Sequence, residues 1–172
     1  HLAAMLGVKR TEDNRLLCMD ININGTDNII NACVQNNINH VVVASSSEIY
    51  GEPTTNPLTE DSETKGKTVY AVSKLASEEL VKGYNQIHPQ LNYTIARFFN
   101  TYGEGQVAQF VISKFVKRIL DGKNPQVYGS GQQTRSYCHV SDVVNALSMI
   151  CTSPDSRNKT YNIGNPTQKY SL

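Results

Sequence analysis

Two stretches of sequence decide the fold: Val41-Val42-Val43-Ala44-Ser45-Ser46-Ser47, and the segment Tyr70-Ala-Val-Ser-Lys74 that comes after it. The apolar run in the first stretch predicts a strand that is buried on both faces, as in a parallel sheet. The second stretch opens a helical pattern, and residues four apart share one face of a helix. The sequence therefore predicts a buried strand that delivers a serine hydroxyl close to a helix presenting both Tyr70 and Lys74.

Ser46, Tyr70 and Lys74 have the chemistry needed to take a proton from an alcohol. A free phenol titrates near ~10, and a neighbouring ammonium favours the phenolate. We therefore expect Lys74 to lower the pKa of Tyr70 toward the range of a general base. Ser46 would hold a substrate alcohol against the phenol. The set predicts proton removal from a carbinol while a hydride leaves the same carbon.

Strands and helices alternate along the rest of the chain. Strands are expected at residues 40–44, 93–99, 126–128 and 136–139, and helices after Thr26 and Asp27, at residues 70–84 and 110–120, and after Ser141. Residues 51–67 are rich in turn-forming and charged residues, which predicts a loop over the site. This alternation indicates an α/β fold with a doubly wound parallel sheet.

Composition excludes several classes of function. The chain has 172 residues, enough for a hydrophobic core, and 39% hydrophobic with 18% charged residues is typical of a globular protein. A net charge of +1 gives no reason to expect nucleic acid or an acidic membrane as a partner. No apolar run approaches the ~20 residues of a membrane span. The four cysteines are widely spaced, which indicates reduced thiols, and the four histidines form no metal-ligand pattern.

An ordered set of motifs extends almost from one end of the chain to the other. The motifs are His1-Leu-Ala-Ala4, Asn22-Ile-Asn-Gly-Thr26, Ser45-Ser-Ser-Glu-Ile-Tyr-Gly51, Tyr70-Ala-Val-Ser-Lys74, Arg97-Phe-Phe-Asn-Thr-Tyr-Gly103, Arg135-Ser-Tyr-Cys-His-Val-Ser-Asp142 and Tyr161-Asn-Ile-Gly164. Together they resemble the extended short-chain dehydrogenase/reductases, in the branch of NAD-dependent nucleotide-sugar epimerases and dehydratases. A Tyr-x-x-x-Lys match alone would be weak, because many helices contain one by chance.

The resemblance implies a Rossmann-like fold and a bound NAD. Residues 1–101 would be the C-terminal part of the NAD-binding domain, and residues 102–172 part of a small C-terminal substrate lobe. The residues that it implies near NAD are His1, Ala3, Ala4, Ser45, Tyr70, Lys74 and Phe99. Lys74 would hydrogen-bond the nicotinamide ribose, and Asn22 is expected to order the backbone near the site.

The resemblance also implies a nucleoside-diphosphate sugar as substrate. Ser46 would orient the sugar O4, and the other residues implied at the substrate are Ser47, Asn100, Tyr128, Arg135 and Tyr137. A fork-shaped guanidinium such as that of Arg135 suits a diphosphate because it donates two hydrogen bonds at once. Asn100 would bind the same diphosphate, and Tyr128 would lie near the base of the nucleotide.

Glu48 is the residue that bears most on the choice between epimerisation and elimination or decarboxylation. Several dehydratases and decarboxylases of the family have Glu at this place, where a carboxylate beside a 4-keto sugar could remove the C5 proton. Ser47 departs from the Asp of one 4,6-dehydratase class, which weakens that alternative. Epimerisation at C4 is the favoured reaction; a dehydratase or UDP-glucuronate decarboxylase remains open, because residues 135–142 and Asn165-Pro166 also resemble the decarboxylase branch.

Two alternatives of other classes remain at this stage. One is a non-catalytic NAD-binding module, against which the intact Ser-Tyr-Lys set counts. The other is a dehydrogenase of non-nucleotide alcohols, which does not explain Arg135. By resemblance, three strands should precede His1, so the sequence is expected to be part of a longer chain. A cytoplasmic homodimer, formed through the Tyr70 helix and the helix before it, is also expected from the resemblance.

Overall fold

A three-stranded sheet forms the centre of the larger part of the molecule. The computed structural model describes the chain except for residues 53–55, 128, 133, 168–169 and 172. The chain divides into two compact units: residues 1–98 with 147–162, and residues 99–146 with 163–172. The division at residue 101 that the sequence suggested remains a prediction for the whole protein, and each unit is described separately below.

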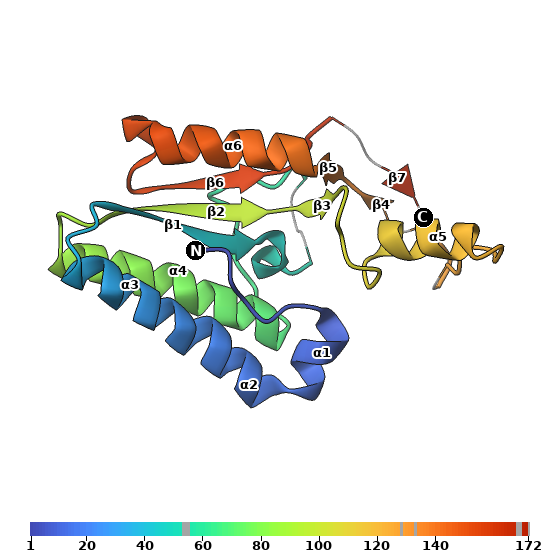
Figure 1. Cartoon of the computed structure of the whole chain (residues 1–172), viewed down its shortest axis with the longest axis horizontal. Helices are drawn as coiled ribbons and strands as arrows, with labels where there is room; N and C mark the ends of the chain where they lie inside the picture. Colours follow the sequence, from blue (N-terminus) through green and yellow to red (C-terminus); the bar gives the residue numbers. More distant parts are fainter. Residues whose placement is uncertain (53–55, 128, 133, 168–169, 172) are drawn as a thin grey trace. The chain divides into compact units, whose positions relative to one another are not determined.

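The first unit contains most of the helices and the central sheet. Its elements in chain order are α1 (Val8–Asp13), α2 (Arg15–Met19), the π-helix η1 (Asp20–Asn24), α3 (Gly25–Gln35), β1 (His40–Ser46), the 3-10 helix η2 (Ser47–Tyr50), α4 (Val69–Ile87), β2 (Asn92–Phe98), the second half of α6 (Val140–Thr152), the 3-10 helix η3 (Pro154–Ser156) and β6 (Lys159–Ile163). The last residue of β6, Ile163, lies in the second unit. The strand order is β1-β2-β6, and all three strands point the same way in Figure 1.

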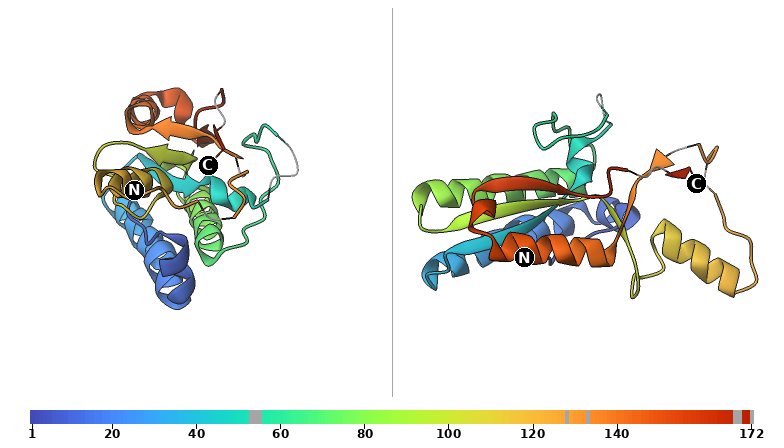
Figure 2. Two further views of the ribbon diagram at one scale, coloured as in Figure 1. Left: turned by 90° about the vertical axis from the view of Figure 1, so that its right-hand side faces the viewer. Right: turned by 90° about the horizontal axis from the view of Figure 1, so that it is seen from above.

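The parallel register of β1 and β2 brings two predicted segments together. His40 lies beside Asn92 and Ser46 beside Phe98 at the other end of the pair. Helices α3 and α4 cover one face of the sheet (Figures 1 and 2). The buried core between them consists of Ile30, Val41, Val43, Val81, Leu91 and Ile95. Burial of such aliphatic side chains is the main force that holds the layers together, at about 1.5–3 kcal/mol for each side chain. The predicted α/β fold with a parallel sheet is confirmed.

Helix α4 begins with a side-chain cap. The side chain of Thr68 accepts a hydrogen bond from the backbone N–H of Ala71, which satisfies one of the free N–H groups of the first turn. The helix then runs for 19 residues, to Ile87. The cap fixes the first turn of α4, and Tyr70 is part of that turn.

The second unit is built around a short parallel pair of strands. Its elements are β3 (Asn100–Tyr102), α5 (Val111–Leu120), β4 (Thr134–Arg135), β5 (Tyr137–His139), the first half of α6 (Val140–Thr152) and β7 (Tyr170–Ser171). Strand β3 pairs with β5 in parallel, and β4 pairs with β7 in antiparallel orientation. Gly164 is required in this unit because a Cβ there would lie 2.9 Å from the Cβ of Phe99.

Three local predictions are wrong. Residues 126 and 127 of the predicted strand 126–128 are irregular, and Tyr128 lies outside the described residues. The helix predicted after Thr26 and Asp27 begins earlier, because the chain is already helical through α2 and η1 and α3 starts at Gly25; the Thr26 hydroxyl donates to the backbone oxygen of Asn22. Helix α6 begins at Val140, so Ser141 lies inside its first turn. No helix in the described part of the chain is long and apolar enough to cross a membrane.

Candidate active site

Ser46, Tyr70 and Lys74 come together where β1 ends and α4 begins, as the sequence predicted. Ser46 is the last residue of β1, and its buried side chain is hydrogen-bonded to the phenol of Tyr70. The Lys74 ammonium lies 5.8 Å from the centroid of the Tyr70 ring, which is the spacing expected for residues one turn apart. Carboxyl ends of parallel strands are where open α/β folds bind ligands.

Lys74 is buried and held by the strand. Its side chain is 5% exposed, and Nζ donates to the backbone oxygen of Ala44 over 2.8 Å. Burial lowers the pKa of Lys74 from 10.5 to about 8. Among the described residues Ala44 is the one hydrogen-bond partner of this ammonium, which leaves two of its three N–H donors for a ligand. Such a buried donor set fits the hydroxyls of a ribose.

The phenol of Tyr70 differs from the sequence prediction. Its pKa is raised to about 12, mainly by burial and to a smaller extent by the negative charge of Glu48, while the hydrogen bond with Ser46 partly opposes the rise. The expectation that Lys74 sets a low pKa is therefore wrong for this structure. The physical reason is that the phenolate is poorly solvated there, while the ammonium that would stabilise it is bonded to Ala44 and is itself held at a lowered pKa.

Glu48 lies beside the same phenol. It sits in η2, directly after the strand that ends in Ser46, and its backbone N–H donates to the Ser46 hydroxyl over 3.2 Å. Its carboxylate accepts a hydrogen bond from the Thr68 hydroxyl over 3.3 Å. Although the residue as a whole is exposed, the surrounding protein partly desolvates the carboxyl and raises its pKa. Ser47, the preceding residue of η2, is half-buried.

The cofactor residues predicted in the first unit divide into two groups. His1 lies alongside β1, where its backbone nitrogen donates to Val42 and its oxygen accepts from Ala44. Ala3 is exposed and Ala4 is half-buried on the same segment. The hydroxyl of Ser45, by contrast, donates to buried Glu78 over 2.5 Å, so only its backbone remains for a cofactor contact. These roles remain predictions.

Asn22 fixes this N-terminal segment, as expected from the sequence. Its buried side chain accepts from the backbone N–H of Met5 over 2.7 Å and donates to the Met5 oxygen over 3.1 Å. It also donates to the hydroxyl of Ser73, the neighbour of Lys74. One buried amide therefore joins the segment that carries His1, Ala3 and Ala4 to helix α4.

The remaining predicted residues belong to the second unit. The parallel pairing of β3 and β5 sets Asn100 beside Tyr137, and the side chain of Asn100 is exposed. The Tyr137 hydroxyl is buried, and among the described residues it has no hydrogen-bond partner. Burial raises the pKa of Tyr137 and the charge of Arg135 opposes this rise. Arg135 is exposed, one of its nitrogens donates to the Thr134 oxygen, and Phe99 is half-buried. Tyr128 lies outside the described residues.

The family model for NAD dependent epimerases and dehydratases matches residues 1–164. The chain belongs to the NAD dependent epimerase/dehydratase family. A UDP-N-acetyl-α-D-glucosaminuronate decarboxylase from Bacillus cytotoxicus is 36% identical over 98% of this chain and 54% of its own length.

Two solved structures are also similar to this chain. A UDP-N-acetylglucosamine 4-epimerase from Methanobrevibacter ruminantium is 30% identical, with a TM-score of 0.91 over 100% of this chain and 56% of the other. The dTDP-glucose 4,6-dehydratase DesIV from Streptomyces venezuelae, solved with NAD bound, is 27% identical, with a TM-score of 0.92 over 99% of this chain and 52% of the other. These matches confirm the Rossmann-like fold. The chain spans about half the length of the relatives it matches.

A set of buried polar residues behind the site was not predicted from the sequence. Arg97 and Glu78 form an ion pair, and Tyr50 packs against the Arg97 guanidinium. One signal could have revealed them: Glu78 lies four residues after Lys74 and shares its helix face, and a buried carboxylate requires a cationic partner. Among the described residues no group of three or more His, Cys, Asp or Glu side chains is placed to hold a metal ion.

Proposed function

We propose that the protein to which this chain belongs is an NAD-dependent nucleotide-sugar epimerase that works through a 4-keto sugar. The observation that supports this most directly is the contact of Ser46 with the Tyr70 phenol, beside the buried ammonium of Lys74. A module that only binds NAD has no need for a phenol hydrogen-bonded to a buried serine. Family membership supports NAD as the cofactor and a nucleoside-diphosphate sugar as the substrate.

Each of the three side chains has a role at the sugar C4. Ser46 donates a hydrogen bond that orients O4, and Tyr70 as phenolate takes the O4 proton. Lys74 binds the ribose of the cofactor and adds positive charge near the phenolate. NAD, when bound, supplies the acceptor for the C4 hydride and a positive ring that favours the phenolate. Tyr70 would return the proton to O4, and NAD, when bound, would supply the hydride to the opposite face of the 4-keto sugar, which would give the epimer.

The binding of the diphosphate is assigned to the second unit. Arg135 provides the cationic fork, and Asn100 and Tyr137 provide neutral donors. The buried Tyr137 hydroxyl supports this role, because it has no hydrogen-bond partner among the described residues, and a buried donor is costly unless a ligand or another group satisfies it.

Elimination or decarboxylation is the second candidate, and Glu48 favours it. Its carboxylate lies next to the Tyr70 phenol and is partly desolvated, which is the environment of a carboxylate that acts as a base. Such a base could remove a C5 proton once C4 is a ketone. The same intermediate therefore serves an epimerase, a dehydratase or a decarboxylase.

Product mass separates these reactions. We would incubate the full-length protein with NAD and UDP-, dTDP- and GDP-sugars, including a UDP-uronate, and weigh the products. A new isomer of unchanged mass is the expected result, while loss of water or carbon dioxide would replace epimerisation by the second candidate. Tyr70→Phe is the control, and full activity of this variant would contradict the proposed chemistry.

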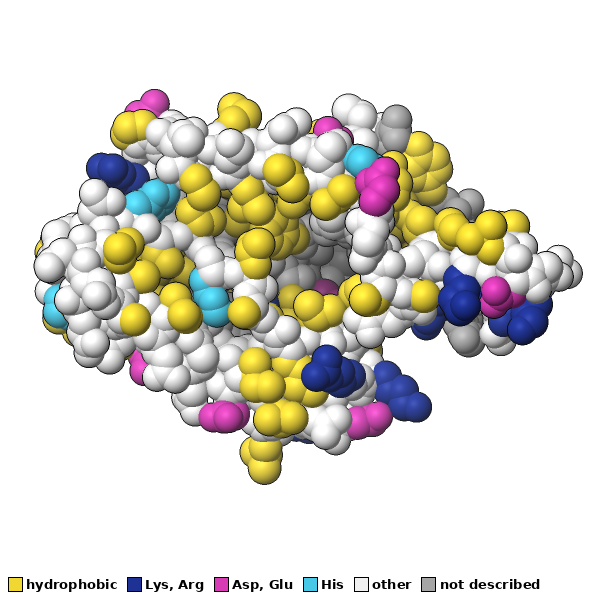
Figure 3. Space-filling model, viewed as in Figure 1, with side chains coloured by type: hydrophobic (Ala, Val, Ile, Leu, Met, Phe, Trp, Pro, Cys, Tyr) yellow, Lys and Arg dark blue, Asp and Glu magenta, His cyan; other side chains and the backbone are white. Residues whose placement is uncertain are grey.

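We also propose a cytoplasmic homodimer that forms through α4 and the helical segment before it. The apolar side chains of Leu16, Leu17, Ile21 and Val72 are exposed on α2, η1 and α4. Figure 3 displays apolar surface along the lower edge of the molecule, with charged side chains on both sides. Exposed apolar surface with a charged rim is typical of a protein interface. All four cysteines are unpaired, which supports a reducing compartment.

A further inference from the structure

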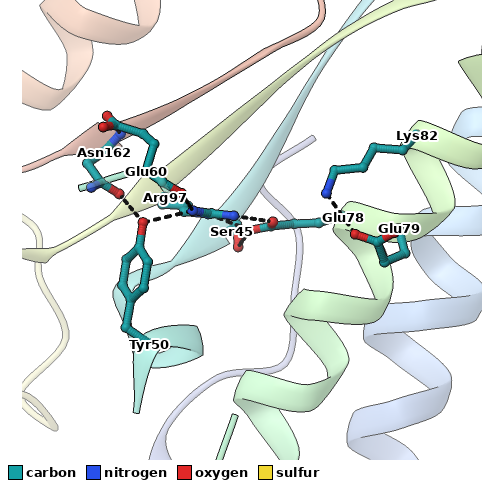
Figure 4. A network of polar contacts seen from close by, with 8 residues as sticks. All are labelled: Ser45, Tyr50, Glu60, Glu78, Glu79, Lys82, Arg97 and Asn162. Carbon is teal, nitrogen blue, oxygen red and sulfur yellow. Dashed lines mark hydrogen bonds and ion pairs between the residues drawn. The ribbon is translucent and has the colours of Figure 1, made fainter. Parts of the chain in front are cut away.

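A buried ion pair lies directly behind the Ser46-Glu48 turn. Arg97 donates from Nε and Nη2 to the two carboxylate oxygens of Glu78, over 3.0 and 2.8 Å (Figure 4). The residues are 6% and 1% exposed. Burial opposes the charge of Arg97, but the hydrogen bonds and the charge of Glu78, with a further contribution from Tyr50, raise its pKa above the ordinary value. The pair is therefore an anchor with a charged guanidinium, fixed by two hydrogen bonds.

Both ends of one short segment are bonded to this anchor. At the first end, the Ser45 hydroxyl donates to Glu78 over 2.5 Å. At the other end, the Tyr50 hydroxyl accepts from Arg97 over 2.8 Å and donates to the side chain of Asn162 over 2.7 Å. Figure 4 shows these side chains converging from the strand, the η2 turn and helix α4. Residues 46–49, with Ser46 and Glu48 among them, lie between the two attachments.

The same anchor also fixes the helix that carries the other catalytic candidates. Glu78 lies one turn after Lys74 and two turns after Tyr70 on α4, and Lys74, like Glu78, is buried. The carboxylate that holds Ser45 is therefore part of the helix face that presents Tyr70 and Lys74. A bidentate ion pair restricts both distance and orientation, whereas a single hydrogen bond restricts mainly distance.

We propose that the Glu78–Arg97 pair, through Tyr50 and Ser45, is a positioning device that sets Ser46 and Glu48 against the Tyr70 phenol. Neither Glu78 nor Arg97 touches the reacting atoms in this scheme. The inference rests on the proposed function, because it assigns a kinetic consequence to the placement of Ser46. The competing explanation is an ion pair that contributes only to stability.

A single hydroxyl provides the sharpest test. Tyr50→Phe in the full-length protein removes the hydrogen bonds that join the end of the η2 turn to Arg97 and to Asn162, and leaves the aromatic ring and the ion pair in place. Arg97→Lys is the second variant, since it keeps the charge and removes the fork. The matched control is Glu79→Gln, which lies next to Glu78 on the same helix but forms an exposed ion pair with Lys82 (Figure 4).

Turnover is measured per NAD-loaded site, together with KM for the nucleotide sugar and the unfolding temperature. Small misplacement of a catalytic group reduces turnover by about tenfold to a hundredfold. We expect Tyr50→Phe to lower kcat by about tenfold with little change in KM, and Glu79→Gln to leave both constants unchanged. The double variant Tyr50→Phe/Arg97→Lys should have the same kcat as Arg97→Lys alone, because both substitutions break the same connection between Arg97 and the η2 turn.

The outcomes separate this inference from the proposed function. An unchanged kcat per loaded site in Tyr50→Phe, with or without a lower unfolding temperature, would overturn the positioning role and leave the proposed function intact. The positioning role would also be overturned if the loss of kcat in the double variant equals the product of the losses in the two single variants, because the two residues would then act independently. If the wild-type protein turns over no nucleotide sugar, the proposed function fails, and the inference fails with it.

Discussion

Replacement of Lys74 by Met tests the electrostatic cost of the buried ammonium. The side chain is 5% exposed and its pKa is lowered from 10.5 to about 8 because burial disfavours the charged form. A change in pKa of this size corresponds to about 3 kcal/mol, at about 1.4 kcal/mol for each tenfold change in the protonation equilibrium. This cost is imposed on the folded wild-type protein at neutral pH and is absent from Lys74→Met.

The pH dependence has a definite sign. Between pH 8 and 10.5 the folded wild-type protein has lost the proton while the unfolded chain still holds it, so stability rises with pH across this window. Below pH 8 both states are protonated and the full cost remains. We therefore expect the free energy of unfolding of wild type minus that of Lys74→Met to rise by about 3 kcal/mol from pH 7 to pH 10.5.

The difference in the free energy of unfolding between wild type and Lys74→Met is more informative than either free energy alone. Lys74→Met also removes the hydrogen bond to the Ala44 oxygen, which costs about 1–3 kcal/mol, but this loss does not vary with pH. Urea unfolding of the NAD-free, full-length proteins at several pH values measures the difference. Lys82→Met removes an exposed lysine from the same helix and is expected to give no such rise. A difference that stays constant or falls between pH 8 and 10.5 would refute the assignment.

Three further predictions concern the site and its support. Glu48→Gln removes a charge that raises the pKa of Tyr70, so the rising limb of the pH–kcat/KM profile should move to lower pH; an unmoved limb would contradict this. Asn22→Ala leaves the Met5 N–H without its acceptor and should cost about 2 kcal/mol in denaturant unfolding, whereas an unchanged midpoint would mean that the segment is held otherwise. Gly51→Ala should cost about 1–3 kcal/mol, because Gly51 has φ +63° and a Cβ would lie 2.5 Å from the Lys65 oxygen; thermal melting checks it, and an unaltered melting temperature would exclude the clash.

Local sequence signals were sufficient to predict an element where burial of apolar side chains is the dominant force. The apolar run that forms β1 and the 3.6-residue periodicity of α4 both predict elements that bury one continuous surface, and the structure confirms both. Helices α1 and α2 and the π-helix η1 were missed, because they expose apolar residues such as Leu16 and Leu17 and so lack a periodic pattern. The irregular structure at residues 126–127 could not be read from composition, since short apolar runs have no unique preference.

The sequence by itself determined the fold class, the family and the meeting of Ser46, Tyr70 and Lys74, because strand burial and helix periodicity are properties of neighbouring residues. Only the tertiary structure decided the electrostatics. The raised pKa of Tyr70 and the lowered pKa of Lys74 follow from desolvation, which depends on the atoms that surround a group and not on its neighbours in the chain. The Glu78–Arg97 pair likewise joins residues 19 positions apart, and its consequence for the turn at residues 45–50 exists only once strand, turn and helix are packed.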